Sequence, residues 1–173
     1  MEPHDAKIPE SFRTCRARST DVQNMSRVML MPENSVRMLF IGNSFTTKND
    51  LPTLIGSIAQ AGKGITIDSE VISTGGASLR RHWNAGAASR IADGNWDYVV
   101  LQEQSTLPIK NSKRFHENVR EFVPAINDSG ATLVLFMTWA RKRELANQRL
   151  LTDSYNQIGS ELGATVVPVG TAW

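Results

Sequence analysis

The stretch Arg37-Met-Leu-Phe-Ile-Gly-Asn-Ser-Phe-Thr-Thr47 decides how the rest of the chain is expected to fold. Its apolar run, 38–41, predicts a short buried strand, which Gly42 and Asn43 then interrupt. Ser44 is the first hydroxyl beyond the break. A buried strand that ends in a glycine turn and presents a serine is one way to expose a nucleophile at a sheet edge. The alternative is that Ser44 is an ordinary turn residue.

Apolar segments and helical patterns alternate along the remainder of the chain. Further strands are predicted over 65–72, 98–101, 131–137 and 164–169. Helical spacing predicts helices over 51–60, parts of 79–91, 112–127 and 143–162, the last one running through Leu145 and Leu150. Apolar strands separated by helices indicate a parallel sheet covered on both faces. The sequence therefore predicts an α/β fold, a three-layer α/β/α sandwich with five parallel strands. For the order of the strands we take the flavodoxin-like arrangement, in which the first strand lies beside the point where the order reverses.

Composition limits the classes of function. The chain has 173 residues, which suits one domain with a proper core. Hydrophobic residues make up 40% and charged residues 21%, as in an ordinary globular domain. Because 19 Lys and Arg face 17 Asp and Glu, the charge balance gives no case for a nucleic-acid partner. No apolar run approaches the ~20 residues that span a bilayer, so no membrane span is expected.

Metal and cofactor sites are not expected either. The single cysteine, Cys15, excludes an intrachain disulfide and a cysteine-based zinc site. His4, His82 and His116 lack the spacing of metal ligands. A flavodoxin-like nucleotide binder is a weak alternative, because no glycine-rich phosphate loop follows the first strand and no Walker-type lysine is present.

The first residues differ from the rest of the chain. Residues 1–35 are polar, mixed in charge and interrupted by prolines, which predicts a poorly ordered extension before a domain at 36–173. The extension lacks the apolar core of a signal peptide, so the cytoplasm is the default expectation. The compartment and the oligomeric state stay open.

Polar residues follow the first three predicted strands. They are Ser44, then Gly75 and Gly76, then Gln102 and Gln104. Acyl transfer to a serine needs hydrogen-bond donors aimed at the developing oxyanion. The candidates are the backbone N–H of Ser44, that of Gly75 or Gly76, and the side-chain amide of Gln102 or Gln104. The alternatives are a simple turn for the glycines and surface polarity for the glutamines.

Three blocks of the sequence resemble those of the SGNH (GDSL-like) hydrolases. Ile41-Gly-Asn-Ser-Phe-Thr46 is similar to the first block, in the variant with Asn where the commoner motif has Asp. Thr74-Gly-Gly76, with Leu79 and His82-Trp83, resembles the second. The third block resembles the corresponding block of a subgroup that lacks the usual Gly-x-Asn-Asp, and two later segments resemble the same subgroup. These are Tyr98-Val-Val-Leu-Gln-Glu-Gln-Ser105, Phe136-Met-Thr-Trp139 and Pro168-Val-Gly-Thr-Ala-Trp173.

The resemblance covers residues 36–173 and implies an esterase or lipase-like hydrolase that acts on a small-molecule ester, with O-acyl carbohydrate among the candidates. It assigns Ser44 as nucleophile and first oxyanion donor and Gly75 or Gly76 as second donor. The third donor falls on Gln102 or Gln104. It also implies a pocket that includes Asn43, His82 and Glu103. No metal or cofactor is implied.

One departure from the family is large. The family places its base, an Asp-x-x-His block, beyond the last strand and before a final helix, whereas the sequence reaches Trp173 without such a block. His82 is expected to be a structural or pocket-wall residue, and His116 is expected to be exposed on a helix.

The expected protein is therefore an esterase truncated at its C-terminus and impaired, since a general base contributes ~10²–10⁴-fold. An exposed apolar strip is expected where the final helix would pack. The alternative is a non-catalytic binding module that retains the pocket.

Overall fold

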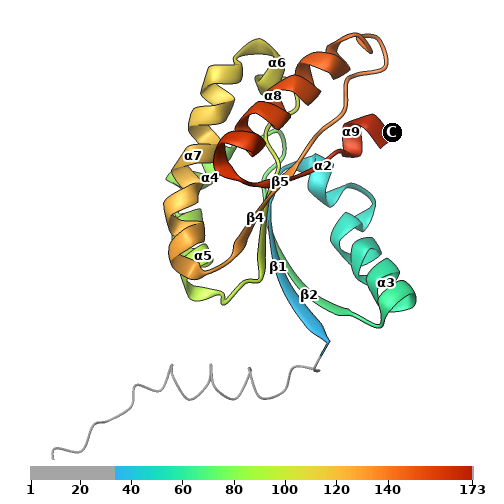
Figure 1. The fold of residues 1–173 in the computed structure, drawn as a ribbon, viewed down its shortest axis with the longest axis vertical. Coiled ribbons are helices and arrows are strands. Elements are labelled where there is room, and N and C mark those ends of the chain that lie inside the picture. Colours follow the sequence, from blue (N-terminus) through green and yellow to red (C-terminus); the bar gives the residue numbers. More distant parts are fainter. Residues whose placement is uncertain (1–33, 173) are drawn as a thin grey trace, which may run out of the picture. The chain divides into compact units, whose positions relative to one another are not determined.

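The structure, a computed structural model, describes residues 34–172 (Figure 1). The extension predicted over 1–35 lies outside this range except for its last two residues, as do Cys15 and His4. Ser35 already belongs to the first strand, β1 (Ser35–Gly42), so the domain begins slightly earlier than predicted.

The described chain contains one parallel sheet. Its other strands are β2 (Thr66–Ser73), β3 (Tyr98–Leu101), β4 (Thr132–Phe136) and β5 (Thr165–Val167). The strands follow the order β2-β1-β3-β4-β5 and every neighbouring pair is parallel. This is the flavodoxin-like order that the sequence predicts. In such sheets, ligands bind beyond the carboxyl ends of the strands, near the point where the strand order reverses. Here that point lies beside β1.

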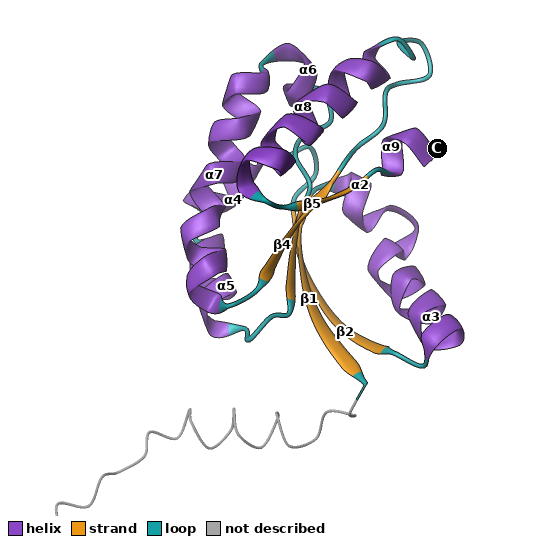
Figure 2. Cartoon of the chain, in the orientation of Figure 1, coloured by secondary structure: helices purple, strands orange, loops and turns teal. Residues whose placement is uncertain are grey.

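Helices cover both faces of the sheet, which confirms the predicted three-layer fold (Figure 2). The long ones are α3 (Leu51–Lys63), α7 (Ser112–Ser129) and α8 (Asn147–Leu162). Shorter elements follow the strands: α2 (Ser44–Thr47), the 3₁₀ turn η1 (Lys48–Asp50), α4 (Leu79–Asn84), α5 (Ala87–Asp93), α6 (Leu107–Lys110) and α9 (Val169–Ala172). The sequence does not predict α2, α6 or α9, because single helical turns carry no periodic pattern.

Two apolar clusters hold these layers together, because alternate side chains of each strand face opposite sides. Leu39 and Ile41 face the larger cluster, on the side of α7 and α8. Phe40 faces the smaller cluster, which lies toward α3. The larger cluster includes Val99, Leu101, Phe115, Val119, Phe122, Leu135, Tyr155 and Ile158. The smaller one includes Val100, Val134 and Phe136, with Leu51 and Ile55 of α3 packed against it.

The predicted helix over 143–162 starts four residues late. Residues 141–146 form turns, and Leu145 is 68% exposed. Leu150 lies within α8 but is 52% exposed, whereas its neighbour Leu151 is fully buried. Successive helical residues point about 100° apart, so the two leucines cannot share the inward face. The prediction that the helix runs through Leu145 is wrong, whereas Leu150 lies in the helix as predicted but not on its buried face.

His116 is buried, so the prediction that it is exposed is wrong. Its side chain is 5% accessible and lies between α7 and α8, with Nε2 2.9 Å from the carbonyl oxygen of Ser154 and 3.2 Å from the Ser154 hydroxyl. Helix α8 packs along α7, which widens the buried face of α7 beyond its apolar stripe. Periodicity within one helix gives no sign of such a neighbour.

Apolar side chains are exposed on the α3 side of the sheet. Tyr98 and Val167 occupy the same strand face as Val100 and Phe136 but are partly open to solvent. The buried side chains of Val100, Val134 and Phe136 lie between these two, so the expected apolar strip stays a prediction. None of the helices formed by residues 34–172 is both long and apolar enough to cross a membrane.

Candidate active site

Ser44 lies directly beyond the carboxyl end of β1. It is exposed and is the first residue of α2. Asn43 caps this turn: its backbone is extended and its Oδ1 accepts a hydrogen bond from the N–H of Phe45, at 3.1 Å. Within residues 34–172 neither the hydroxyl nor the backbone N–H of Ser44 has a hydrogen-bond partner. Both groups are therefore free to meet a ligand.

Asn43 ties together the loops that follow three strands. Its backbone N–H donates to Oε1 of Gln102 at 2.9 Å, in the loop after β3. Its Nδ2 donates to the carbonyl oxygen of Ala77 at 3.0 Å, in the loop after β2. Asn43 is 3% accessible, so these bonds replace bonds that water would otherwise make. The loops that follow β1, β2 and β3 are thus joined through the side chain and the backbone of Asn43.

Gly42 leaves room for these bonds. A Cβ at this position would lie 2.6 Å from Oε1 of Gln102 and would also meet the hydroxyl of Thr46. Thr46 is buried and donates its hydroxyl hydrogen to the same Oε1, at 3.0 Å. Nothing in the sequence pattern indicates that Thr46 is buried.

His82 forms a hydrogen bond with the last residue of β1. It lies on α4, is buried, and its Nε2 lies 2.6 Å from the carbonyl oxygen of Gly42. Since a carbonyl oxygen only accepts, Nε2 carries the hydrogen. Burial, as the main cause, lowers the pKa of His82, against the opposing effect of the Gly42 hydrogen bond. A neutral His82 therefore positions the backbone that leads to Ser44.

Gly75 and Gly76 form an exposed turn after β2. The strand register pairs Gly42 with Ser73, so Ser44 and Gly75 each lie two residues beyond a paired position. Gly76 has φ +66°, a conformation that glycine adopts without steric cost. Among the described residues, neither glycine's N–H makes a hydrogen bond. Both are available as donors.

The two glutamines have different surroundings. Gln102 is buried and both ends of its amide make hydrogen bonds: Oε1 accepts from Asn43 and Thr46, and Nε2 donates to the carbonyl oxygen of Glu103. Gln104 is only partly buried, and its Oε1 accepts from the N–H groups of Thr106 and Leu107, both at 3.0 Å. The Nε2 of Gln104 makes no hydrogen bond within residues 34–172.

Glu103 is fully buried between the glutamines. Its Oε1 accepts from the backbone N–H of Leu79 at 3.1 Å and of Gln104 at 2.7 Å. Its Oε2 accepts from Nδ2 of Asn118 at 2.8 Å, and Oδ1 of Asn118 accepts from Nε of Arg80 at 3.3 Å. Desolvation raises the pKa of Glu103, and the three hydrogen bonds oppose this shift. No pattern in the sequence indicates the contribution of Arg80 on α4 or Asn118 on α7, because both are distant from Glu103 along the chain.

Neither histidine among residues 34–172 makes a hydrogen bond to Ser44. His82 is committed to Gly42, and His116 lies against Ser154 between two helices. The same range contains no group of three or more His, Cys, Asp or Glu side chains arranged to hold a metal ion.

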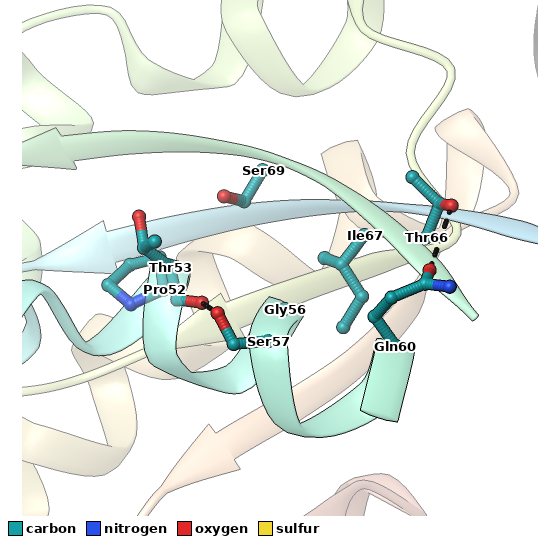
Figure 3. Close-up of a pocket in the computed structure, with 8 residues that line it drawn as sticks. All are labelled: Pro52, Thr53, Gly56, Ser57, Gln60, Thr66, Ile67 and Ser69. Carbon is teal, nitrogen blue, oxygen red and sulfur yellow. Dashed lines mark hydrogen bonds between the residues drawn. The ribbon is translucent and has the colours of Figure 1, made fainter. Parts of the chain in front are cut away.

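Two hollows are open to a ligand. One, of about 300 Å³, begins at Phe45, next to Ser44, and is lined also by Lys48, Asn49, Leu51, Leu54, Phe136, Trp139 and Val169. The other is an open groove of about 380 Å³ between α3 and β2 (Figure 3). It presents hydroxyl and amide groups, of which Ser57 and Thr66 already bond to Thr53 and Gln60. It holds no titratable side chain, and we assign it no chemistry.

Comparison with known proteins defines the class. No protein-family model and no curated protein sequence matches the chain. The similar solved structures include SGNH hydrolases and GDSL-family esterases. The chain therefore has the fold of an SGNH hydrolase, as its sequence blocks indicate.

Three of these structures show the extent of the likeness. A protein from Slackia heliotrinireducens assigned to the SGNH hydrolases is 25% identical, with a TM-score of 0.66 over 77% of this chain and 78% of its own. AlinE4, an SGNH-hydrolase family esterase, is 16% identical, with a TM-score of 0.60 over 80% and 77%. The acetyl xylan esterase AlAXEase is 12% identical, with a TM-score of 0.60 over 76% of each chain.

Proposed function

We propose that this protein is a serine ester hydrolase of the SGNH type that forms an acyl-enzyme on Ser44. The observation that carries the proposal is the position of Ser44: exposed, beyond the end of β1, with its hydroxyl and N–H free within the described residues. Around it, the turn at Gly75 and Gly76 and the Gln104 amide supply further unengaged donors. The fold is shared with esterases.

The reaction follows from these groups. The Ser44 oxygen attacks the acyl carbon and loses its proton to a base, and the carbonyl electrons move to the oxygen. The N–H groups of Ser44 and of Gly75 or Gly76, with the Nε2 of Gln104, donate to that oxyanion. Collapse breaks the bond to the alcohol, which leaves with the proton. Water then attacks the acyl-enzyme and releases the acid and Ser44. An O-acyl carbohydrate remains a candidate substrate, since one structural neighbour is an acetyl xylan esterase.

The proposal leaves open which group accepts the proton of Ser44. Because no histidine among residues 34–172 contacts Ser44, we expect these residues alone to hydrolyse esters slowly. This same observation favours a second candidate function, a binding module that keeps the pocket without turnover.

An experiment with an external base separates the two. The 173-residue protein and its Ser44→Ala variant are treated with a fluorophosphonate probe, and hydrolysis of an aryl ester is followed with and without added imidazole. Imidazole supplies the proton acceptor, so an enzyme that lacks only its base should be accelerated by about tenfold or more, within the contribution of a general base. Labelling and acceleration must both vanish in Ser44→Ala.

A protein that is neither labelled nor accelerated, although folded, would contradict the esterase proposal and favour the binding module. The reading frame beyond the codon for Trp173 gives a second check, since an Asp-x-x-His segment there would supply the base in cis.

A further inference from the structure

The hollow beside Ser44 is built around two aromatic rings from distant parts of the chain. Phe45 belongs to α2, after β1, and Trp139 follows β4. Their rings stack face to face, with centroids 4.5 Å apart and planes 6° from parallel. Both side chains are only partly buried. The rings therefore form a rigid apolar wall that remains open to a ligand.

The remaining walls of this hollow are mostly apolar. Leu51 and Leu54 contribute from α3, Phe136 from the end of β4, and Val169 from α9, with Lys48 and Asn49 as the polar members. Leu54 is 50% exposed, so its apolar surface faces solvent until something covers it. Removing such surface from water is favourable by roughly 25 cal/mol per Å², which makes an apolar group the ligand with most to gain here.

The hollow and the polar donors lie toward opposite faces of the sheet. Phe136 belongs to the apolar cluster on the α3 side. Asn43 reaches Ala77, which leads into α4, and Leu79 of α4 belongs to the cluster on the other side. Ser44 lies at the strand end between them. An acyl group on Ser44 that directs its carbonyl oxygen toward the donors thus directs its chain toward Phe45 and Trp139.

We propose that the hollow lined by Phe45 and Trp139 binds the acyl chain of the substrate and selects apolar acyl groups longer than acetyl. Phe45 follows Ser44 directly, and their Cα atoms are therefore about 3.8 Å apart. The hollow therefore begins at the residue next to the one that would carry the acyl group, and a chain longer than acetyl is the group that can extend into it. This inference rests on the proposed function, because it takes Ser44 as the acylated residue.

The test combines binding with turnover. Binding of acetate and of octanoate is measured by calorimetry on the Ser44→Ala variant, so that it does not depend on catalysis. Hydrolysis of p-nitrophenyl acetate, butyrate and octanoate is measured on the unmodified protein, with imidazole present. We expect octanoate to bind and acetate not to bind, and kcat/KM to rise with acyl length.

Two substitutions place the effect in the hollow. Leu54→Asp puts a charge on its wall at an exposed position, where folding tolerates the change. Ile58→Asp is the matched control, because Ile58 lies one turn further along α3, is 63% exposed and does not line the hollow. Leu54→Asp should lower octanoate affinity and the octanoate-to-acetate ratio of kcat/KM by about tenfold or more, the effect of one or two buried methylene groups. Ile58→Asp should leave both unchanged. Trp139→Ala should act like Leu54→Asp if it folds.

The outcomes distinguish this inference from the proposed function. Octanoate binding that Leu54→Asp removes, without any Ser44-dependent hydrolysis, would support the subsite and contradict the esterase. Ser44-dependent hydrolysis with no dependence on acyl length, and the same in Leu54→Asp, would overturn the subsite and leave the esterase standing. Equal losses in Leu54→Asp and Ile58→Asp would also overturn it.

Discussion

The carboxylate of Glu103 accepts a hydrogen bond from the backbone N–H of Leu79, which lies 24 residues earlier in the chain. The same Oε1 accepts from the N–H of Gln104. One buried carboxylate therefore joins the loop after β2, which carries Gly75 and Gly76, to the loop after β3. Both loops supply candidate oxyanion donors, so the spacing between those donors depends on this side chain.

Replacing Glu103 should change how stability depends on pH. Burial raises the pKa of Glu103 above its ordinary 4.5, so between pH 4.5 and the folded-state value the folded protein binds more protons than the unfolded one. Its contribution to the free energy of unfolding therefore falls as pH rises through that window. Glu103→Gln should remove this slope.

The effect is measured by urea denaturation at a series of pH values from about 4 to about 8, which begins near the ordinary carboxyl pKa and extends above it. Glu144→Gln, at an exposed position, serves as control and should leave the slope unchanged. Glu103→Ala should cost about 1–3 kcal/mol near neutral pH, because it leaves the N–H groups of Leu79 and Gln104 without their acceptor. An unchanged slope in Glu103→Gln would mean that the carboxylate titrates as it does in water.

His82 should give a pH dependence of opposite sign. Its pKa is lowered from 6.5 by burial, so below about pH 6.5 the unfolded protein binds more protons than the folded one. The free energy of unfolding must then fall as pH drops through 6.5 toward the folded-state pKa. His82→Phe should lose this acid-side decline and, by leaving the Gly42 carbonyl oxygen unpaired, cost about 1–3 kcal/mol at neutral pH.

An NMR titration of the His82 ring provides the direct measurement. A midpoint at or above 6.5 would be incompatible with the neutral, hydrogen-bonded ring described above. His82→Gln is the matched variant, because its amide can still donate to Gly42 while it cannot titrate.

A methyl group at Gly42 should disrupt the site, whereas one at Gly62 should not. Gly42→Ala forces the Cβ against Gln102 and Thr46, the two residues that hold Asn43. We expect a loss of about 1–3 kcal/mol, typical of overpacking, together with slower labelling of Ser44. At Gly62, on α3, a Cβ meets nothing within 4 Å. Gly62→Ala should instead add about 0.5–1 kcal/mol, the helix preference of alanine.

Thermal unfolding and the rate of fluorophosphonate labelling report both effects. If the Gly42→Ala variant is labelled at the rate of the unmodified protein, the close packing of Gly42 against Gln102 and Thr46 does not affect the reactivity of Ser44.

Isosteric changes at the two glutamines separate their roles. Gln104→Glu keeps the Oε1 that accepts from Thr106 and Leu107 but removes the free Nε2 donor. We expect Ser44 labelling to slow by about 10²–10³-fold, the usual cost of one oxyanion donor, with little change in Tm. Gln102→Glu places a second carboxylate beside Glu103 and should mainly lower Tm. The reverse pattern would make Gln102 the donor.

The alternation of apolar strands with helical patterns was enough to predict the parallel sheet, and the expected flavodoxin-like order is confirmed. These features are local, because burial of a strand and its termination leave a mark in neighbouring residues. The start of one helix was predicted too early: α8 begins at Asn147 rather than at residue 143. Residues 141–146 form turns, although their composition suits a helix.

Only the tertiary structure decided what the polar residues do. Gln102 and Gln104 both follow β3, and the sequence alone does not distinguish their roles. In the structure, Gln102 accepts a hydrogen bond from Asn43, whereas the amide nitrogen of Gln104 makes no hydrogen bond among the described residues. The burial of His116 and the stacking of Phe45 on Trp139 likewise depend on elements far apart in the chain. Hydrogen bonding and packing are set by neighbours in space, and a single sequence records neighbours only along the chain. The sequence therefore places Ser44 at the end of a strand, whereas only the tertiary structure shows which groups surround it.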